Sequence, residues 1–251
     1  LGILGGVCGL LAVFYAGDGF GRAFVLQRTP VAGAVDEEAN QFGQRGRSRE
    51  SFFNVASVVE MEAGRSTGQA ITGVGLFSPT YSTYDLGIKS TGPTRLHNSG
   101  KNAESLVNGV PTLRNLSVPM WSIESTEAVS EVTLGQGLEV KRHGDDVTLI
   151  NNTGQVLHSI RVGNAINIDR LNPGQSHTVP VPLWKDNSYP TFTGSDDASN
   201  RMSQRLWNVM ISHTHQQKSL MVTAWLDAPP VEIELNGKPT TPKHQANLLV
   251  V

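Results

Sequence analysis

Short runs of apolar and β-branched residues, each closed by a turn sequence, follow one another along the C-terminal half of the chain. They span residues 129–134, 138–142, 146–151 and 156–162. Glycine, asparagine and aspartate separate these runs, as in the Asn151–Gly154 segment, and such residues favour tight turns. Strands at this short, regular spacing are typical of antiparallel sandwiches and barrels. The sequence therefore predicts a mostly β fold.

The same alternation begins earlier in the chain. Residues 53–61 and 69–77 predict the two strands of a hairpin, and residues 113–123 predict another strand. The hairpin connection, Gly64–Gly68, also matches G-x-S-x-G, the nucleophile elbow of hydrolases, but that elbow requires a helix after the serine. Because a strand follows here, we predict a simple turn. Residues 92–109 are rich in glycine, asparagine and serine and predict a long loop.

One helix interrupts the β pattern. Met202, Leu206 and Val209 share one helical face, and Ser195 or Asp196 can cap the segment that contains them. We therefore expect a helix near residues 196–212.

The chain has 251 residues, enough for one large domain or two ordinary ones. The strand spacing becomes more regular after about residue 125. We expect one or two antiparallel β-sandwich domains, arranged as a first β domain at 51–125 and a second at 126–251 that carries the helix. A polar linker at 18–50 precedes them.

The N-terminal segment, Leu1–Gly17, carries no charged residue. A spanning helix needs roughly 20 apolar residues, so residues upstream of Leu1 would complete a transmembrane helix that ends here. Gly5 and Gly9 form a small-xxx-small pair that permits close helix packing in a membrane. A signal-peptide core and a buried helix of a soluble domain are the alternatives.

Composition excludes some classes of function. With 20 basic and 22 acidic residues the net charge is −2, which lacks the basic excess of a nucleic-acid-binding protein. The single cysteine, Cys8, forms neither an internal disulfide nor a cysteine-based zinc site. Neither a P-loop nor a dinucleotide-binding glycine motif occurs, so we expect no nucleotide cofactor.

Few residues offer chemistry in a recognisable pattern. His213 and His215 could share a metal if they lay on a strand; at the end of a helix they would diverge, and we expect no metal site. Trp184, Tyr189 and Phe192 stand in a proline-containing loop before the expected helix. If exposed, they would form a surface for a ligand or partner; the alternative is that they plug the end of the sandwich.

Several short strings, taken in order, carry a resemblance to a known family. They are Val74–Pro79, Val118–Ser122, Asn151–Gly154, Leu171–Gln175 and Val222–Asp227. In this order they resemble the C-terminal β-rich region of uncharacterised bacterial multi-pass membrane proteins, a family of unknown function. The resemblance implies a membrane-anchored protein whose β region lies outside the cytoplasm, periplasmic or at the cell surface. Arginines after the apolar segment, such as Arg22 and Arg28, favour the opposite orientation; we follow the resemblance.

These observations predict a non-enzymatic, membrane-tethered extracytoplasmic β module for binding or for assembly of an envelope complex with protein partners. The alternative is an extracytoplasmic hydrolase acting on polysaccharide or peptide, with acidic or histidine side chains brought together by the fold. A third possibility is a subunit that has no ligand of its own and stabilises a neighbouring protein.

Overall fold

The computed structural model describes residues 50–97, 104–163, 166–180, 201, 203, 204, 206, 207 and 221–251. Within them the chain is mostly β, as the sequence predicts. The strands are β1 (Phe52–Met61), β2 (Thr67–Ser78), β3 (Ser82–Lys89), β4 (Thr94–His97), β5 (Glu104–Val107), β6 (Val110–Val118), β7 (Ser122–Thr133), β8 (Gly137–His143), β9 (Asp146–Asn152), β10 (Leu157–Val162), β11 (Ile166–Leu171), β12 (Ser176–Pro180), β13 (Val222–Leu226), β14 (Glu232–Leu235), β15 (Lys238–Pro239) and β16 (His244–Val250).

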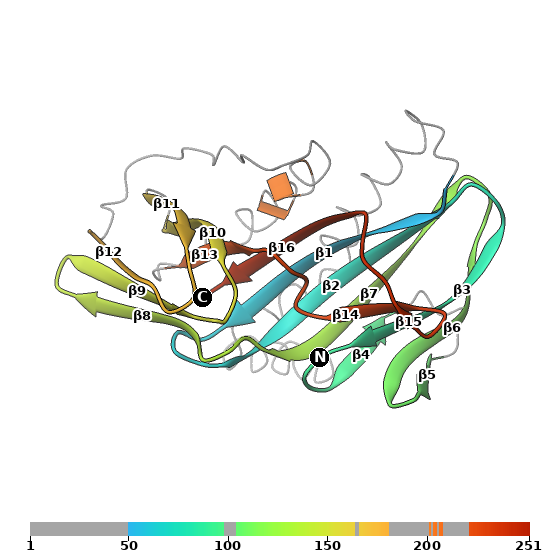
Figure 1. The fold of residues 1–251 in the computed structure, drawn as a ribbon, viewed down its shortest axis with the longest axis horizontal. Helices are drawn as coiled ribbons and strands as arrows, with labels where there is room; N and C mark the ends of the chain where they lie inside the picture. Colours follow the sequence, from blue (N-terminus) through green and yellow to red (C-terminus); the bar gives the residue numbers. More distant parts are fainter. Residues whose placement is uncertain are drawn as a thin grey trace, which may run out of the picture.

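These strands form three sheets (Figure 1). A long eight-stranded sheet has the order β11-β10-β13-β16-β1-β2-β7-β4. A five-stranded sheet has the order β15-β14-β3-β6-β5, and a three-stranded sheet the order β12-β9-β8. The two smaller sheets lie toward opposite ends of the long one (Figure 1).

The centre of the long sheet joins the two ends of the described chain. β1 pairs in parallel with β16, from Asn54 opposite His244 to Glu60 opposite Val250. On its other side β1 forms the predicted hairpin with β2, which in turn pairs with β7 over the whole length of both strands. The domain boundary expected at residue 125 falls inside β7.

One face of the long sheet, here called the inner face, packs against both smaller sheets. Val55, Val59 and Val74 belong to the same buried cluster as Leu86 of the five-stranded sheet and Leu149 of the three-stranded sheet. Alternation along each strand directs these apolar residues to one side. The arrangement is sandwich-like, with one sheet facing two.

The opposite, outer face carries a second buried cluster. Ala56 and Val58 of β1 and Leu248 of β16 pack there with Leu206. Leu206 and Trp207 are helical and buried, and the helical fragment lies next to the long sheet in Figure 1. The described residues inside the expected helix at 196–212 are thus helical, while its ends lie outside the described residues.

Two strand predictions were wrong. The region expected to be one long loop at 92–109 contains β4 and β5. Both strands are four residues long and occupy sheet edges. Edge strands are often short and polar, so few apolar residues alternate along them. The strand expected at 113–123 is divided between β6 and β7, because Pro119 and the next two residues form a turn. A proline there donates no ladder hydrogen bond.

Among the described residues, no helix is both long and apolar enough to cross a membrane. The segment predicted to enter the membrane, with Gly5 and Gly9, lies outside the described residues.

Candidate functional site

The side chains singled out from the sequence lie outside the part of the chain that the structure describes. This holds for Trp184, Tyr189 and Phe192 and for both histidines, His213 and His215. Within the described ranges, no group of three or more His, Cys, Asp or Glu side chains is arranged to hold a metal ion. The candidate site is therefore built from other residues.

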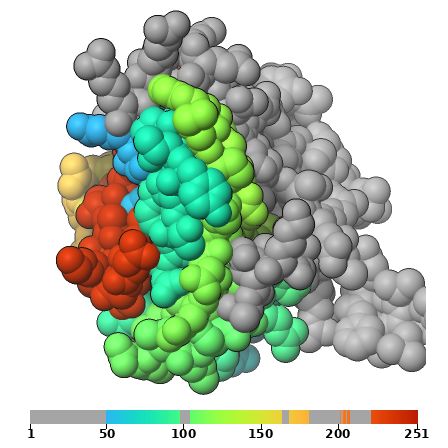
Figure 2. Space-filling view, turned by 90° about the vertical axis from the view of Figure 1, so that its right-hand side faces the viewer, coloured from blue at the N-terminus to red at the C-terminus, as the bar shows by residue number. Residues whose placement is uncertain are grey.

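Three large side chains are exposed together where the β2–β3 and β6–β7 connections meet. Tyr81 is 68% exposed, Met120 63% and Trp121 49%. We call this surface the aromatic end. Figure 2 views the molecule from this side, with the β2–β3 connection in teal beside the β6–β7 connection in yellow-green.

Hydrogen bonds hold the two connections of the aromatic end together. The Trp121 amide donates to the carbonyl oxygen of Ser78 at 2.9 Å. The Ser117 hydroxyl donates to the Tyr81 hydroxyl oxygen, also at 2.9 Å. The Ser122 hydroxyl donates to the Pro119 carbonyl at 2.7 Å and closes the β6–β7 turn. The exposed side chains are thus mounted on a fixed backbone.

The backbone of Trp121 is strained. Its φ of 57° lies in the left-handed region, which bulky residues rarely adopt. Such a conformation costs on the order of 1 kcal/mol or more and persists where surrounding contacts impose it. Residues in this state are found preferentially at functional sites, and here the strain presents an indole ring to solvent.

A stack of rings supports the aromatic end from beneath. Trp121 meets Phe77 edge-on, with ring centroids 6.2 Å apart, and Phe77 stacks on Phe52 at 4.9 Å. The ammonium group of Lys243 lies 4.5 Å from the Phe52 ring centre, a favourable cation–π distance. Phe77 is buried, so the exposed indole is anchored to the long sheet.

The outer face next to this stack is polar. Asn54 of β1 and Ser125 of β7 face each other across Gly75, which places no side chain between them. Two residues further along, Glu127 lies opposite His97 of β4. We call Asn54, His97, Ser125 and Glu127 the outer polar cluster.

The outer polar cluster contains buried polar atoms that lack hydrogen bonds. Asn54 is fully buried, and neither its Oδ1 nor its Nδ2 has a partner among the described residues. The same is true of Ser125 Oγ and His97 Nδ1. Burial raises the pKa of the Glu127 carboxyl above its ordinary value of 4.5. Buried polar atoms are normally bonded, so these atoms stand out among the described residues.

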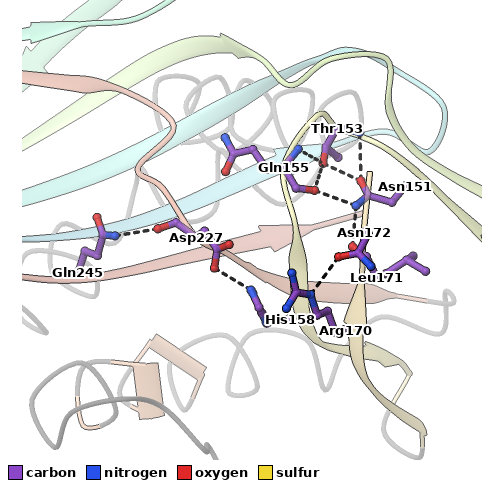
Figure 3. Close-up of polar contacts among 9 residues, drawn as sticks. All are labelled: Asn151, Thr153, Gln155, His158, Arg170, Leu171, Asn172, Asp227 and Gln245. Carbon is purple, nitrogen blue, oxygen red and sulfur yellow. Dashed lines mark hydrogen bonds and ion pairs between the residues drawn. The ribbon is translucent and has the colours of Figure 1, made fainter. Parts of the chain in front are cut away.

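A contrasting polar network lies at the other end of the long sheet (Figure 3). The side-chain nitrogen of Asn151, Nδ2, donates to the backbone carbonyls of Gln155 and Leu171, each at 2.8 Å. Its Oδ1 accepts from the amide and the hydroxyl of Thr153, at 3.1 and 2.7 Å. Every hydrogen-bonding position of this buried side chain is filled, so it ties the β9–β10 turn to β11 and performs a structural task.

Other charged side chains near this network also have structural roles. His158 Nε2 lies 2.7 Å from Asp227 Oδ1, and both side chains are partly exposed; the Gln245 side chain donates to the Asp227 carbonyl. The Arg161 guanidinium lies 4.8 Å from the Trp207 ring centre. Burial lowers the pKa of the Arg161 guanidinium below its ordinary value. These contacts fasten strands and the helical fragment together.

Comparisons with known proteins identify no relative in sequence. No protein-family model matches the chain, and no curated protein is similar to it. Among solved structures, a GH20 exo-β-N-acetylglucosaminidase from Vibrio harveyi in complex with N-acetylglucosamine aligns with 55% of this chain and 20% of its own. The identity is 9% and the TM-score is 0.22, too low to support an argument about fold or function.

The sequence interpretation missed the aromatic end. Its signal was present in the Pro119–Trp121 string, where a proline interrupts a strand pattern and two large apolar residues follow. Because the pattern on both sides is strand-like, the sequence predicts one continuous strand through these residues. The cross-strand pairs of the outer polar cluster depend on register and have no signal in a single sequence.

Proposed function

We propose that this protein is a non-enzymatic, membrane-tethered extracytoplasmic β module that binds a protein partner in an envelope complex. The observation that carries the proposal is the aromatic end, where Tyr81, Met120 and Trp121 are exposed on two connections that hydrogen bonds join. Tyrosine, tryptophan and methionine are enriched where proteins bind one another, and tryptophan and tyrosine dominate binding energy there.

The geometry of the aromatic end favours recognition of a partner. Its side chains are mounted on hydrogen-bonded turns and on the Trp121–Phe77–Phe52 stack. A surface already fixed in position loses little entropy on binding. The outer polar cluster begins on the same strands, within two to four residues of this stack.

The membrane tether and the extracytoplasmic location rest on the sequence. They draw on the uncharged segment Leu1–Gly17 and on the family resemblance. The full-length protein should remain in the membrane fraction after washing with high salt and be released by detergent. Recovery in the soluble fraction without detergent would refute the tether.

The alternative function is an extracytoplasmic hydrolase. The observation in its favour is Glu127, whose raised pKa suits a general acid, directly opposite His97. Under this alternative, Glu127→Gln would abolish hydrolysis of cell-wall polysaccharide or peptide by the purified protein. Under the binding proposal, the wild type and this variant are equally inactive.

Truncation of Trp121 tests the binding proposal. Replacing a central aromatic anchor by alanine typically costs at least about 2 kcal/mol, or roughly thirtyfold in Kd. We expect Trp121→Ala to lose the partner that co-purifies stoichiometrically with the wild type from detergent extract. The matched control is Leu106→Ala, because Leu106 is 74% exposed but lies on β5, away from the aromatic end. Equal retention of the partner by both variants would refute the proposal.

A further inference from the structure

Two Asn-Gly sequences form hairpin turns with the same backbone geometry. Asn108-Gly109 connects β5 to β6, and Asn236-Gly237 connects β14 to β15. The φ angles are 52° and 81° in the first turn and 53° and 73° in the second. Positive φ at both positions is the signature of the tight two-residue hairpin. All four residues are exposed, so backbone conformation and exposure do not distinguish the two turns.

The two turns differ in how the asparagine is held. Asn236 Oδ1 accepts a hydrogen bond from the backbone N–H of Asp85 at 2.9 Å. The backbone N–H of Asn236 donates to the Asp85 carbonyl at 2.8 Å. Asp85 lies within β3, an interior strand of its sheet. The carboxamide and the backbone of Asn236 are therefore both fixed to the body of the protein.

Asn108 has no such restraint. Its side chain is exposed and has no hydrogen-bond partner among the residues that the structure describes. It follows β5, a four-residue edge strand; β15 after Asn236 is an edge strand too, so the bonds to Asp85 are what distinguish the two hairpins. Edge hairpins with few contacts open locally at low free-energy cost. The Asn108 carboxamide and the backbone beside it are thus free to rearrange.

We propose that Asn108 is a site of spontaneous deamidation in the folded protein, and that Asn236 is protected by its two hydrogen bonds to Asp85. In this reaction the Gly109 backbone nitrogen, having lost its proton, attacks Cγ of Asn108. The new N–C bond replaces the bond from Cγ to the amide nitrogen, which leaves as ammonia with a proton from solvent. Water then opens the five-membered succinimide at either carbonyl and gives aspartate or isoaspartate.

Glycine is required for this reaction to be fast, because it has no side chain to obstruct ring closure. At Gly109 no atom lies within 4 Å of the position that a Cβ would occupy. The attack also needs backbone angles unlike those of the tight turn, so local opening precedes it. The two hydrogen bonds at Asn236 should make that opening at least about tenfold rarer than at Asn108.

The modification changes both charge and backbone. Each product adds one negative charge to a chain whose net charge is −2. Isoaspartate also inserts a methylene into the main chain, which a two-residue turn cannot accommodate without loss of the Val107–Val110 pair that closes the hairpin. We expect β5 to loosen from β6 in this form.

The experiment is to incubate the purified full-length protein at mildly alkaline pH and body temperature in heavy-oxygen water, and to follow both sites by peptide mass spectrometry. Label and isoaspartate should accumulate at residue 108 at least about tenfold faster than at residue 236. Asn108→Ser should remove the acidic charge variant that ion exchange detects in the wild type.

Two results would overturn the proposal: equal rates at the two sites in the folded protein, or no conversion at residue 108. Concentrated urea provides the control for local sequence. In unfolded protein the two sites should convert at similar rates, because only folding distinguishes them. If residue 108 remained much faster in urea, the protection assigned to Asp85 would be wrong.

Discussion

Two buried asparagines should respond in opposite directions to the same substitution. Asn151 and Asn247 are both almost inaccessible to solvent and both lie on strands. The side chain of Asn151 makes four hydrogen bonds. Neither polar atom of the Asn247 side chain has a partner among the described residues, although Ser57, directly across from it on β1, is bonded to Thr72. Valine suits a strand in both places.

The magnitudes follow from these bonds. Asn151→Val removes four hydrogen bonds of about 1 kcal/mol each. The Thr153 hydroxyl keeps a second acceptor, the Gln155 carbonyl at 3.3 Å, so a loss of about 3–4 kcal/mol is expected. Asn247→Val removes a buried, unpaired amide and should gain about 1 kcal/mol. The two variants should therefore differ by roughly 4–5 kcal/mol.

Urea unfolding of the full chain, followed by tryptophan fluorescence, measures this difference. With a slope of about 2 kcal/mol per M, the midpoint of Asn151→Val should fall by about 1.5–2 M and that of Asn247→Val should rise by about 0.5 M. An Asn247→Val midpoint that falls as far as that of Asn151→Val would refute the reasoning, since Asn247 would then be bonded in the native protein.

Three further predictions concern packing and ionisation. Gly137→Ala should destabilise the fold by more than about 3 kcal/mol, because φ is 84° and the new Cβ would overlap the backbone carbonyl oxygen of Arg65. In the same urea assay Gly144→Ala should cost only about 1 kcal/mol, because φ is 62° but the space around the new Cβ is open. Leu206→Ala should cost about 2–5 kcal/mol because Leu206 is buried against β1 and β16, while exposed Gln204→Ala should stay within about 0.5 kcal/mol. Since burial raises the pKa of Glu127 above 4.5, the folded state holds this proton more tightly than the unfolded state, and the wild type should lose stability relative to Glu127→Gln as pH rises from about 4.5 through the raised pKa. A wild-type stability that stays constant or rises relative to that of Glu127→Gln over this range would contradict the assignment.

The sequence was sufficient to predict the fold class and the central hairpin. β1 and β2 read as apolar, β-branched runs bounded by turn residues because both of their faces are buried, one against the smaller sheets and the other partly against Leu206, and such runs are a sequence signal of a buried strand. Edge strands such as β4 and β5 were missed because they need no apolar side and are short.

Pairing between distant strands could not be predicted. The parallel pairing of β1 with β16 joins residues almost two hundred positions apart, and nothing in either segment specifies its partner. For the same reason, the meeting of Asn54 with Ser125 across Gly75 appears only once the register is known. The aromatic end also depends on register, because the β2–β3 and β6–β7 connections are separated along the chain and meet only in the fold.

Site-specific photo-crosslinking is the most direct test of the aromatic end as the binding surface. A photoreactive phenylalanine analogue would be placed at Met120, which is 63% exposed, and separately at Leu106, which is 74% exposed. The proposal predicts that position 120 crosslinks in native membranes to one protein in stoichiometric yield, and that position 106 does not. Equal crosslinking from both positions, or none from position 120 in membranes where the complex is intact, would contradict it.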